Sequence, residues 1–305
     1  MIHATAFAKL NIGLRVGGRR ADGFHPIHGI FQSIGWADQL AIGAAEQDQV
    51  DSAHGELVSG ERNLGWRALL AAREASGANQ PLSMVLDKQI PVAAGLGGGS
   101  ADAAAALGVG ARMFGLDAAT TLRLATELGS DVPFCLRGGT ALVSGRGEVV
   151  DSQDPLSDFA LAMVVPPIEL STPTVFAEWD RLGGPTAPST ADRALPPSLR
   201  SHGPVANDLE PAATALAPAV ADWQDQLRHA WGRPVLLSGS GPTLYAFFVD
   251  LDEAASALSG VPSGARDVRA AAPVRHGWVW SDGGEVRAPD GSVLHDWPGD
   301  LSPAS

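Results

Sequence analysis

The stretch with the clearest chemical potential is PVAAGLGGGSAD at residues 91–102, where four glycines within five positions are followed by Ser100. Glycine permits positive φ and close approach of a ligand to the backbone, and the first turn of a helix presents unpaired N–H groups at its positive end. A strand-like segment (LSMVLDKQIP) precedes the run and a small-residue segment with helix formers (ADAAAALG) follows it. This order predicts a phosphate-binding loop. A tight turn with Ser100 as the helix cap is the alternative.

The run matches neither of the two common phosphate-binding loops. It lacks the lysine of the GK[ST] P-loop, and the spacing Gly95-x-Gly97-x-x-Ser100 has a serine where the dinucleotide fingerprint has its third glycine. The kind of phosphate ligand must therefore be inferred from other parts of the chain.

The bulk composition narrows the possible functions. A chain of 305 residues with 45% hydrophobic content can bury a substantial core, and its length favours two domains. A formal net charge of −13 without a long Lys/Arg run argues against nucleic acid as a partner, so an anionic ligand must be held locally. The single cysteine, Cys135, excludes an internal disulfide and indicates a reducing compartment, by default the cytoplasm. The N-terminus does not resemble a signal peptide, and the most apolar stretch is a poor membrane span.

The segment 4–16 predicts a strand that positions two polar side chains. Its even positions are apolar from Ala4 to Val16, whereas its odd positions include Lys9 and Asn11. A period of two places one face in the core and puts Lys9 and Asn11 about 7 Å apart on the other face.

The remaining elements alternate between strands and helices, which is an α+β pattern. Helices are predicted at 61–77, after the glycine run, at 118–129 and at 215–231; strands are predicted at 27–45, 82–91, 159–167, 234–241 and 243–250. The Pro/Ser/Ala-rich residues 183–204 predict a flexible insertion, with a short helix at its end as an alternative. Residues 281–305 have little apolar periodicity and predict a hairpin or a loose tail.

The glycine run resembles the second motif of the GHMP kinases, PxxxGLGGGSxxA, which reads here from Pro91 to Ala103. Further segments follow in the order of one branch of that family: AKLNIGL (8–14), RRADGFH (19–25), RNL (62–64), GSDVPF (129–134) and SGSGPT (238–243). The resemblance covers most of residues 1–280. It implies an α+β fold of two GHMP kinase domains, 1–154 and 155–280, with the active site in the cleft between them. The tail, 281–305, lies outside the resemblance.

That branch uses ATP to phosphorylate the 2-hydroxyl of 4-diphosphocytidyl-2-C-methyl-D-erythritol (CDP-methylerythritol), in the non-mevalonate (methylerythritol phosphate) pathway to isoprenoid precursors. The resemblance therefore implies an ATP-dependent kinase with a small-molecule acceptor, and Lys9 and Asp131 as its catalytic pair. A carboxylate can accept the proton that the alcohol loses, and a lysine can hold that carboxylate ionised and orient the hydroxyl. Without the resemblance, Asp131 is equally a helix or turn cap and Lys9 a solvated strand residue.

The resemblance also implies which residues bind ATP. Asn63, Leu64 and Lys88 would lie at the base and sugar, although Lys88 is equally a strand-end charge. Mg²⁺ is expected because the polyphosphate oxygens need neutralising, and Ser100 together with the phosphates themselves is expected to supply its ligands. The loop expected to wrap the phosphates comprises Pro91, Val92, Ala93, Ala94, Gly95, Leu96, Gly97, Gly98, Gly99, Ser100 and Ala101.

For the acceptor, the resemblance implies that Phe24 and Phe176 sandwich the cytosine while His25 reads the edge of the base. Phe24 stands where the family usually has tyrosine, so the ring face is kept and a hydroxyl contact is lost. The alternatives are core positions for the two phenylalanines and a structural loop position for His25.

The polar part of the acceptor is expected to meet Asn11 and Thr172. Gly239, within SGSGPT, is expected to close the cleft near the phosphates, although a plain hairpin would use similar residues.

Two other functions fit parts of the pattern. Another GHMP kinase, acting on homoserine, mevalonate or a sugar, would have a similar glycine loop, but the DGFH segment argues against it. A non-catalytic nucleotide-binding regulator would not need both Lys9 and Asp131. The expected protein has no membrane partner and is a monomer or a homodimer.

Overall fold

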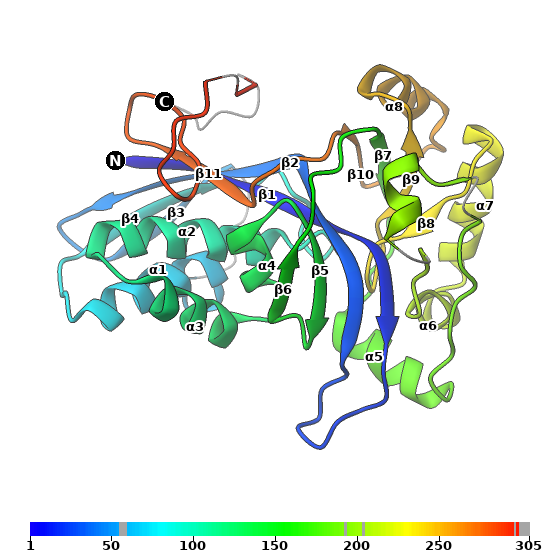
Figure 1. Ribbon diagram of the computed structural model, residues 1–305, viewed down its shortest axis with the longest axis horizontal. Helices are drawn as coiled ribbons and strands as arrows, with labels where there is room; N and C mark the ends of the chain where they lie inside the picture. Colours follow the sequence, from blue (N-terminus) through cyan, green and yellow to red (C-terminus); the bar gives the residue numbers. More distant parts are fainter. Residues whose placement is uncertain (55–59, 192–193, 203–204, 296, 299–305) are drawn as a thin grey trace.

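The computed structural model describes residues 1–305 except 55–59, 192–193, 203–204, 296 and 299–305, and its strands form two sheets (Figure 1). The strands of the first sheet are β1 (Ile2–Val16), β2 (Ile27–Ala44), β3 (Gln49–His54), β4 (Leu82–Asp87), β5 (Thr140–Gly145), β6 (Val149–Ser152) and β11 (Trp278–Ser281). Their order is β11-β1-β2-β4-β3, with β5 also paired to β2 and β6 paired to β5. The second sheet has the order β10-β7-β9-β8 and consists of β7 (Ala160–Val165), β8 (Leu236–Leu237), β9 (Leu244–Phe248) and β10 (Asp267–Ala271).

Helices complete the two units, which are called the first and the second unit after their sheets. The helices of the first unit, which cover one face of its sheet, are α1 (Leu64–Ser76), α2 (Gly98–Phe114), α3 (Ala118–Leu128) and α4 (Val132–Arg137) (Figure 1). Those of the second unit are α5 (Thr172–Arg181), α6 (Glu210–Leu216), α7 (Ala219–Trp231) and α8 (Leu251–Ala257). Short 3₁₀ helices lie at η1 (Gly60–Arg62), η3 (Pro197–Ser201) and η4 (Leu258–Gly260). The predicted α+β fold is thus confirmed. Within the described residues, no helix combines the length and apolar character that crossing a bilayer requires.

Helix α2 is the buried centre of the first unit, and its small residues are a packing requirement. A Cβ on Gly108 would collide with the indole of Trp278, and one on Gly110 would lie 2.7 Å from the Cβ of Ala72 in α1. Larger side chains would therefore push α2 away from both the sheet and α1.

Strand β1 has core residues on both faces, not on one face as predicted. Its even residues belong to one core cluster up to Ala6, to a second cluster from Ala8 to Ile12, and to the first cluster again from Leu14. The even positions therefore change faces twice along the strand.

The two changes coincide with irregularities in the pairing of β1 with β2. Register shifts occur between Phe7 and Lys9 and between Asn11 and Gly13. Each shift inverts the pleat locally, because side chains alternate strictly between faces. Lys9 and Asn11 consequently lie on the face of the first cluster, where the Lys9 Nζ is 5.5 Å from the ring centre of Phe31.

The end of the chain returns to the first sheet. Strand β11 pairs antiparallel with β1, with His3 opposite Ser281 and Ala6 opposite Trp278. Residues 278–281 thus complete the first unit, whereas the predicted boundary assigned 155–280 to the second domain. The local sequence of a short edge strand does not show which strand it pairs with when that strand is far away in the sequence.

The described part of 281–305 is hairpin-like. The backbone of Arg287 exchanges two hydrogen bonds with Trp280 (2.8 and 3.0 Å), and the Leu294 N–H donates to the Val286 carbonyl (2.9 Å). The guanidinium of Arg112, from α2, lies 4.1 Å from the ring centre of Trp280. Of the two predicted alternatives, a hairpin and a loose tail, the first describes these residues.

The predicted insertion at 183–204 lies against the second unit. Its described part includes the short helix η3, which corresponds to the alternative of a short helix at its end, while 192–193 and 203–204 lie outside the described residues. Trp179 donates from Nε1 to the carbonyl of Pro185 (2.9 Å), and Thr190 N–H donates to the Val205 carbonyl (2.8 Å). These bonds tie the described part of the insertion to its surroundings.

Candidate active site

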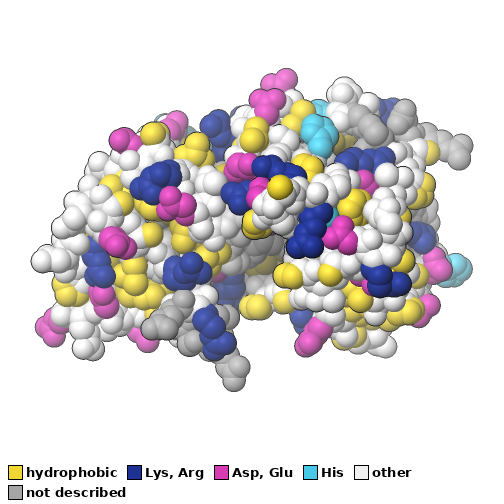
Figure 2. Space-filling view, turned by 90° about the horizontal axis from the view of Figure 1, so that it is seen from below, with side chains coloured by type: hydrophobic (Ala, Val, Ile, Leu, Met, Phe, Trp, Pro, Cys, Tyr) yellow, Lys and Arg dark blue, Asp and Glu magenta, His cyan; other side chains and the backbone are white. Residues whose placement is uncertain are grey.

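One cavity of about 960 Å³ is lined by residues of both units. Figure 2 shows the molecule from below, where Lys and Arg side chains lie near the furrow between its larger and smaller parts. The cavity wall includes all but two of the predicted site residues. The exceptions are Leu96 and Ala101, which are buried in the core. Among the rest are Lys9, Asn11, Phe24, His25, Asn63, Leu64, Lys88, Asp131, Thr172, Phe176 and Gly239.

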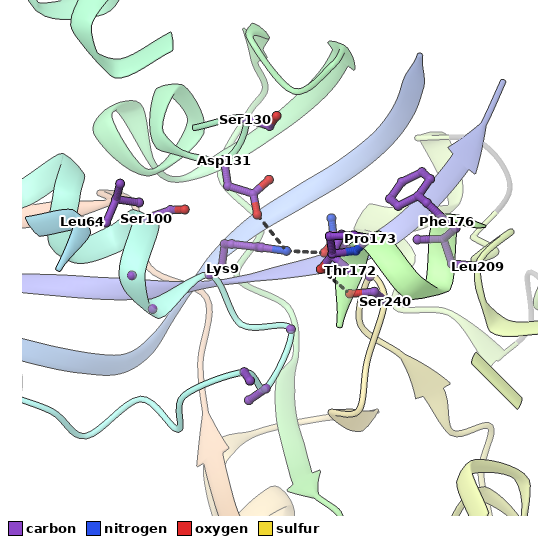
Figure 3. A pocket seen from close by; sticks show the side chains of 18 of the residues that line it. Lys9, Leu64, Ser100, Ser130, Asp131, Thr172, Pro173, Phe176, Leu209 and Ser240 are labelled. Carbon is purple, nitrogen blue, oxygen red and sulfur yellow. Dashed lines mark hydrogen bonds and ion pairs between the residues drawn. The ribbon is translucent and has the colours of Figure 1, made fainter. Parts of the chain in front are cut away.

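Lys9 and Asp131 form an ion pair in this cavity (Figure 3). The Lys9 Nζ lies 3.4 Å from Oδ2 of Asp131 and donates a hydrogen bond to Oδ1 of Asn11 at 2.6 Å. Lys9 is 5% exposed, so it is not a solvated strand residue. Asp131 occupies the N-cap position of α4, but its side chain makes no capping hydrogen bond. Its carboxylate is instead directed to Lys9.

The predicted phosphate loop has the conformation that its glycines allow. Gly95 (φ +77°) and Gly97 (φ +66°) are left-handed, and a Cβ on Gly97 would lie 2.7 Å from Cγ of Lys9. A Cβ on Gly99 would meet no atom within 4 Å, so the helix start is open on that side. The glycine at 97 therefore lets the loop pass directly beneath the Lys9 side chain.

Helix α2 begins at Gly98, with Gly97 as its N-cap and no side-chain cap. The alternative in which Ser100 caps the helix is therefore wrong, because Ser100 lies inside the first turn. Its hydroxyl is left beside the first-turn N–H groups, which have no carbonyl partner within the helix. This arrangement suits a phosphate group.

The turn of SGSGPT packs backbone to backbone against the glycine loop. A Cβ on Gly95 would lie 2.7 Å from the carbonyl oxygen of Gly241. The hydroxyl of Thr243 donates to the carbonyl of Ala94 (2.6 Å), and that of Ser238 donates to the carbonyl of Gly95 (3.2 Å). The turn is thus part of the cavity wall and not an isolated hairpin.

Lys88 lies between two buried carboxylates that the sequence did not single out. Its Nζ donates to Asp38 and, at 2.7 Å, to Asp102. Asp38 Oδ1 also accepts the N–H groups of Gln89 (2.6 Å) and Ile90 (2.8 Å), which lead into the glycine loop. The Lys88 amine is therefore tied into an internal network, and it is not a solvated strand-end charge.

Burial dominates the electrostatics of this cluster. Loss of water contact, which outweighs the attraction of Lys88, raises the pKa of Asp102 to about 8. For Lys88, burial lowers the pKa, but Asp102 and Asp38 more than offset this, so the pKa of the amine rises. Asp102 Oδ1 is buried without a hydrogen-bond partner. In the sequence, Asp102 could have been noticed as a charged residue among the small apolar residues that follow the glycine run, whereas Asp38 had no local signal.

At the other end of the cavity, the expected sandwich of two phenylalanines is arranged differently. The imidazole of His25 stacks on Phe176, with ring centres 5.2 Å apart and planes 27° apart. Its Nε2 lies 3.3 Å from Asp180 Oδ2. Phe24 is 48% exposed, and the guanidinium of Arg146 covers it at 4.8 Å from the ring centre. Asp180 and Arg146 carry charge at this end and were not predicted.

Two further predicted residues, Asn63 and Thr172, make hydrogen bonds that hold the elements around the cavity. Asn63 is the N-cap of α1, where its Oδ1 accepts the Trp66 N–H at 3.0 Å. Thr172 begins α5, and its hydroxyl is 2.8 Å from that of Ser240 (Figure 3). Thr172 thereby links α5 to the second glycine turn.

Comparison with known proteins follows the same division into two units. Residues 63–139 match the family model "GHMP kinases N terminal domain", and residues 195–267 match "GHMP kinases C terminal". The 4-diphosphocytidyl-2-C-methyl-D-erythritol kinase of Pelotomaculum thermopropionicum is 38% identical over 265 residues, which cover 83% of this chain and 91% of the relative.

Solved structures of kinases with similar folds support the relationship found by sequence. A crystal structure of 4-(cytidine 5'-diphospho)-2C-methyl-D-erythritol kinase matches with a TM-score of 0.73 and 30% identity, over 89% of this chain and 98% of the other. Homoserine kinase from Cytophaga hutchinsonii has a TM-score of 0.66 at 18% identity, over 92% of this chain and 97% of the other, and shows the shared fold alone. The chain therefore belongs to the 4-diphosphocytidyl-2-C-methyl-D-erythritol kinase family, a branch of the GHMP kinases.

Proposed function

We propose that this kinase transfers the γ-phosphoryl group of ATP to the 2-hydroxyl of CDP-methylerythritol, a step toward isoprenoid precursors in the methylerythritol phosphate pathway. The observation that carries the proposal is the ion pair of Lys9 and Asp131 in one cavity with the glycine loop and the ring of Phe176. The acceptor is inferred from the names of the relatives.

Asp131 accepts the proton of the attacking hydroxyl. The hydroxyl oxygen forms a bond to the γ-phosphorus, the bond from that phosphorus to the bridging oxygen of ADP breaks, and the proton passes to the carboxylate. Lys9 offers positive charge to the reacting oxygens. Phosphoryl transfer passes through a loose transition state, in which the proton moves late.

The phosphates of ATP bind at the start of α2. The first-turn N–H groups supply hydrogen bonds and the open side of Gly99 supplies room. Mg²⁺, when bound, would neutralise phosphate oxygens. Within the described residues there is no group of three His, Cys, Asp or Glu side chains that could hold a metal. The Ser100 hydroxyl is the protein group that would hold the ion, together with oxygens of the phosphates.

The nucleoside parts of the two substrates occupy opposite ends of the cavity. Asn63, Leu64 and Lys88 lie at the end that takes the base and sugar of ATP. The cytosine stacks on Phe176 and Phe24, while Asn11 and Thr172 contact the polar part of the acceptor. Since His25 and Arg146 already cover these two rings, the base either inserts beside them or displaces the guanidinium from Phe24.

ADP release with a panel of acceptors tests the proposal. Turnover with CDP-methylerythritol, and little with homoserine, mevalonate or simple sugars, is the expected result. ATP binding without turnover of any acceptor would support a regulatory protein instead. We expect this activity in the cytoplasm, from a monomer or a homodimer.

A further inference from the structure

Asn207, just before α6, uses its whole side-chain amide to hold the turn of SGSGPT. Its Nδ2 donates to the carbonyls of Leu237 (2.9 Å) and Gly239 (2.7 Å). Its Oδ1 accepts the N–H of Leu209 at 3.1 Å. The residue is 7% exposed, so water does not replace these bonds if they are lost.

The backbone that carries Asn207 is fixed to β1. Leu14 donates its N–H to the carbonyl of Ala206 (2.7 Å), and its carbonyl accepts the N–H of Asp208 (2.9 Å). The buried carboxylate of Asp208 accepts the Val16 N–H (3.1 Å) and pairs with Arg15 (2.8 Å). Asn207 therefore has a defined position relative to the strand that contains Lys9 and Asn11.

Gly239 is the point where this network reaches the ion pair. Its φ is +56°, and a Cβ there would lie 2.7 Å from Asn11 Oδ1 and 3.7 Å from Lys9 Nζ. Asn11 Oδ1 is the atom to which the Lys9 Nζ donates. The position of the turn thus limits where the Asn11 amide, and with it the Lys9 amine, can lie.

The hydrogen bond from Asn207 Nδ2 to the Gly239 carbonyl also orients the next backbone amide, that of Ser240. The peptide from Gly239 to Ser240 is trans, so the Ser240 N–H points away from the Gly239 carbonyl and hence away from Asn207. Ser240 lines the cavity, and in the described part of the chain no group accepts this N–H. A free amide at such a place can bind a phosphate oxygen.

We propose that Asn207 is a positioning residue for the transfer. It holds the turn 238–241 in a position where Gly239 supports the hydrogen-bonded side chains of Asn11 and Lys9. In the same position, the Ser240 N–H binds a phosphate oxygen of the bound substrates. The inference rests on the proposed kinase function. It concerns a residue that does not line the cavity and that acts on the reacting groups through the turn.

The test compares N207D with Q224E. The first change replaces the Nδ2 donor by an oxygen that faces two carbonyl oxygens. The second is the same amide-to-acid change in the same unit: Gln224 is 2% exposed, its Nε2 donates to Glu210 (3.0 Å) and to the carbonyl of Val235 (3.4 Å), and it does not line the cavity. Both variants are expected to melt at lower temperature than the wild type.

Kinetics then separate the two variants at a temperature where both are folded. N207D is expected to lose about 10- to 100-fold in kcat, because a small misplacement of reacting groups costs that much. Q224E should keep the wild-type constants. Wild-type constants for N207D, or an equal loss in Q224E, would overturn the inference.

A pH series adds a readout that a purely structural role would not move. When protonated, the carboxyl of N207D regains one donor, so its kcat relative to the wild type should fall as pH rises, whereas the same ratio for N207A should stay flat. Parallel profiles for the two variants would contradict the proposed hydrogen bonds. If the wild type itself does not turn over CDP-methylerythritol, the proposed function fails and this inference fails with it.

Discussion

The Nζ of Lys9 lies 3.4 Å from Oδ2 of Asp131, although one residue is in the middle of β1 and the other precedes α4. Asp131 occupies a cap position without acting as a cap, since its side chain makes no capping hydrogen bond. The pair can therefore be altered with little cost to the helix.

The D131N variant should fold normally and lose phosphoryl transfer. An amide has no proton-accepting oxygen comparable to the carboxylate, and general-base catalysis contributes about 10²- to 10⁴-fold. We expect kcat to fall by this factor while the melting temperature stays within a few degrees of the wild type. The measurements are ADP release and thermal unfolding. Turnover close to the wild type would remove Asp131 from its proposed role.

Two glycines of the phosphate loop should respond differently to alanine. G97A places a Cβ against Lys9 at a residue with φ +66°, which strains the backbone by about 1 to 2 kcal/mol before the contact is counted. We expect it to lower both the free energy of unfolding and kcat. Urea unfolding and steady-state kinetics check this.

G99A is the matched control, because its Cβ would meet no protein atom within 4 Å. The variant should unfold like the wild type but bind ATP more weakly if the phosphates occupy that open space. Calorimetric titration with ATP measures the difference. Wild-type ATP affinity in G99A would contradict the proposed phosphate site.

Asp102 should make the folded state less stable as pH rises. Burial raises its pKa from the ordinary value of 3.8 to about 8, so the folded protein holds a proton that the unfolded chain releases. The contribution of Asp102 to the free energy of unfolding is therefore complete below about pH 4 and is lost as pH rises toward 8. Between these values the free energy of unfolding falls by up to about 1.4 kcal/mol per pH unit.

The D102N variant has no carboxyl group at this position, so its free energy of unfolding should not fall with pH for this reason. Urea unfolding at several pH values should show that the free energy of unfolding of D102N, relative to that of the wild type, increases from pH 5 to pH 8. Asn would still leave Lys88 paired with Asp38. Parallel stability curves for the two proteins would show that Asp102 is ionised throughout.

Phe176 should matter for the acceptor and not for ATP. F176L keeps an apolar side chain but removes the ring face, and base stacking contributes about 1 to 3 kcal/mol. We therefore expect the Kd for CDP-methylerythritol to rise by about 5- to 150-fold, with the Kd for ATP unchanged. Equilibrium binding of each substrate measures this. An unchanged acceptor affinity would place the cytosine elsewhere.

Much of the fold could be predicted because local patterns report local structure. The helices near 64–76 and 118–128 follow apolar spacing and caps, and the glycine run before α2 requires a loop where it occurs. Strand β11 escaped prediction because its partner, β1, is at the other end of the chain. Asp38 escaped because only the fold brings Lys88 to it.

The sequence by itself determined the chemistry that is available: a glycine loop for phosphate, a lysine and an aspartate for the hydroxyl, and aromatic rings for a base. The tertiary structure decided how these groups meet. Two register shifts in β1 turn Lys9 and Asn11 toward Asp131, and a turn from the second unit holds them there. Such shifts depend on pairing between strands, which has no counterpart in the alternation of residues along one strand.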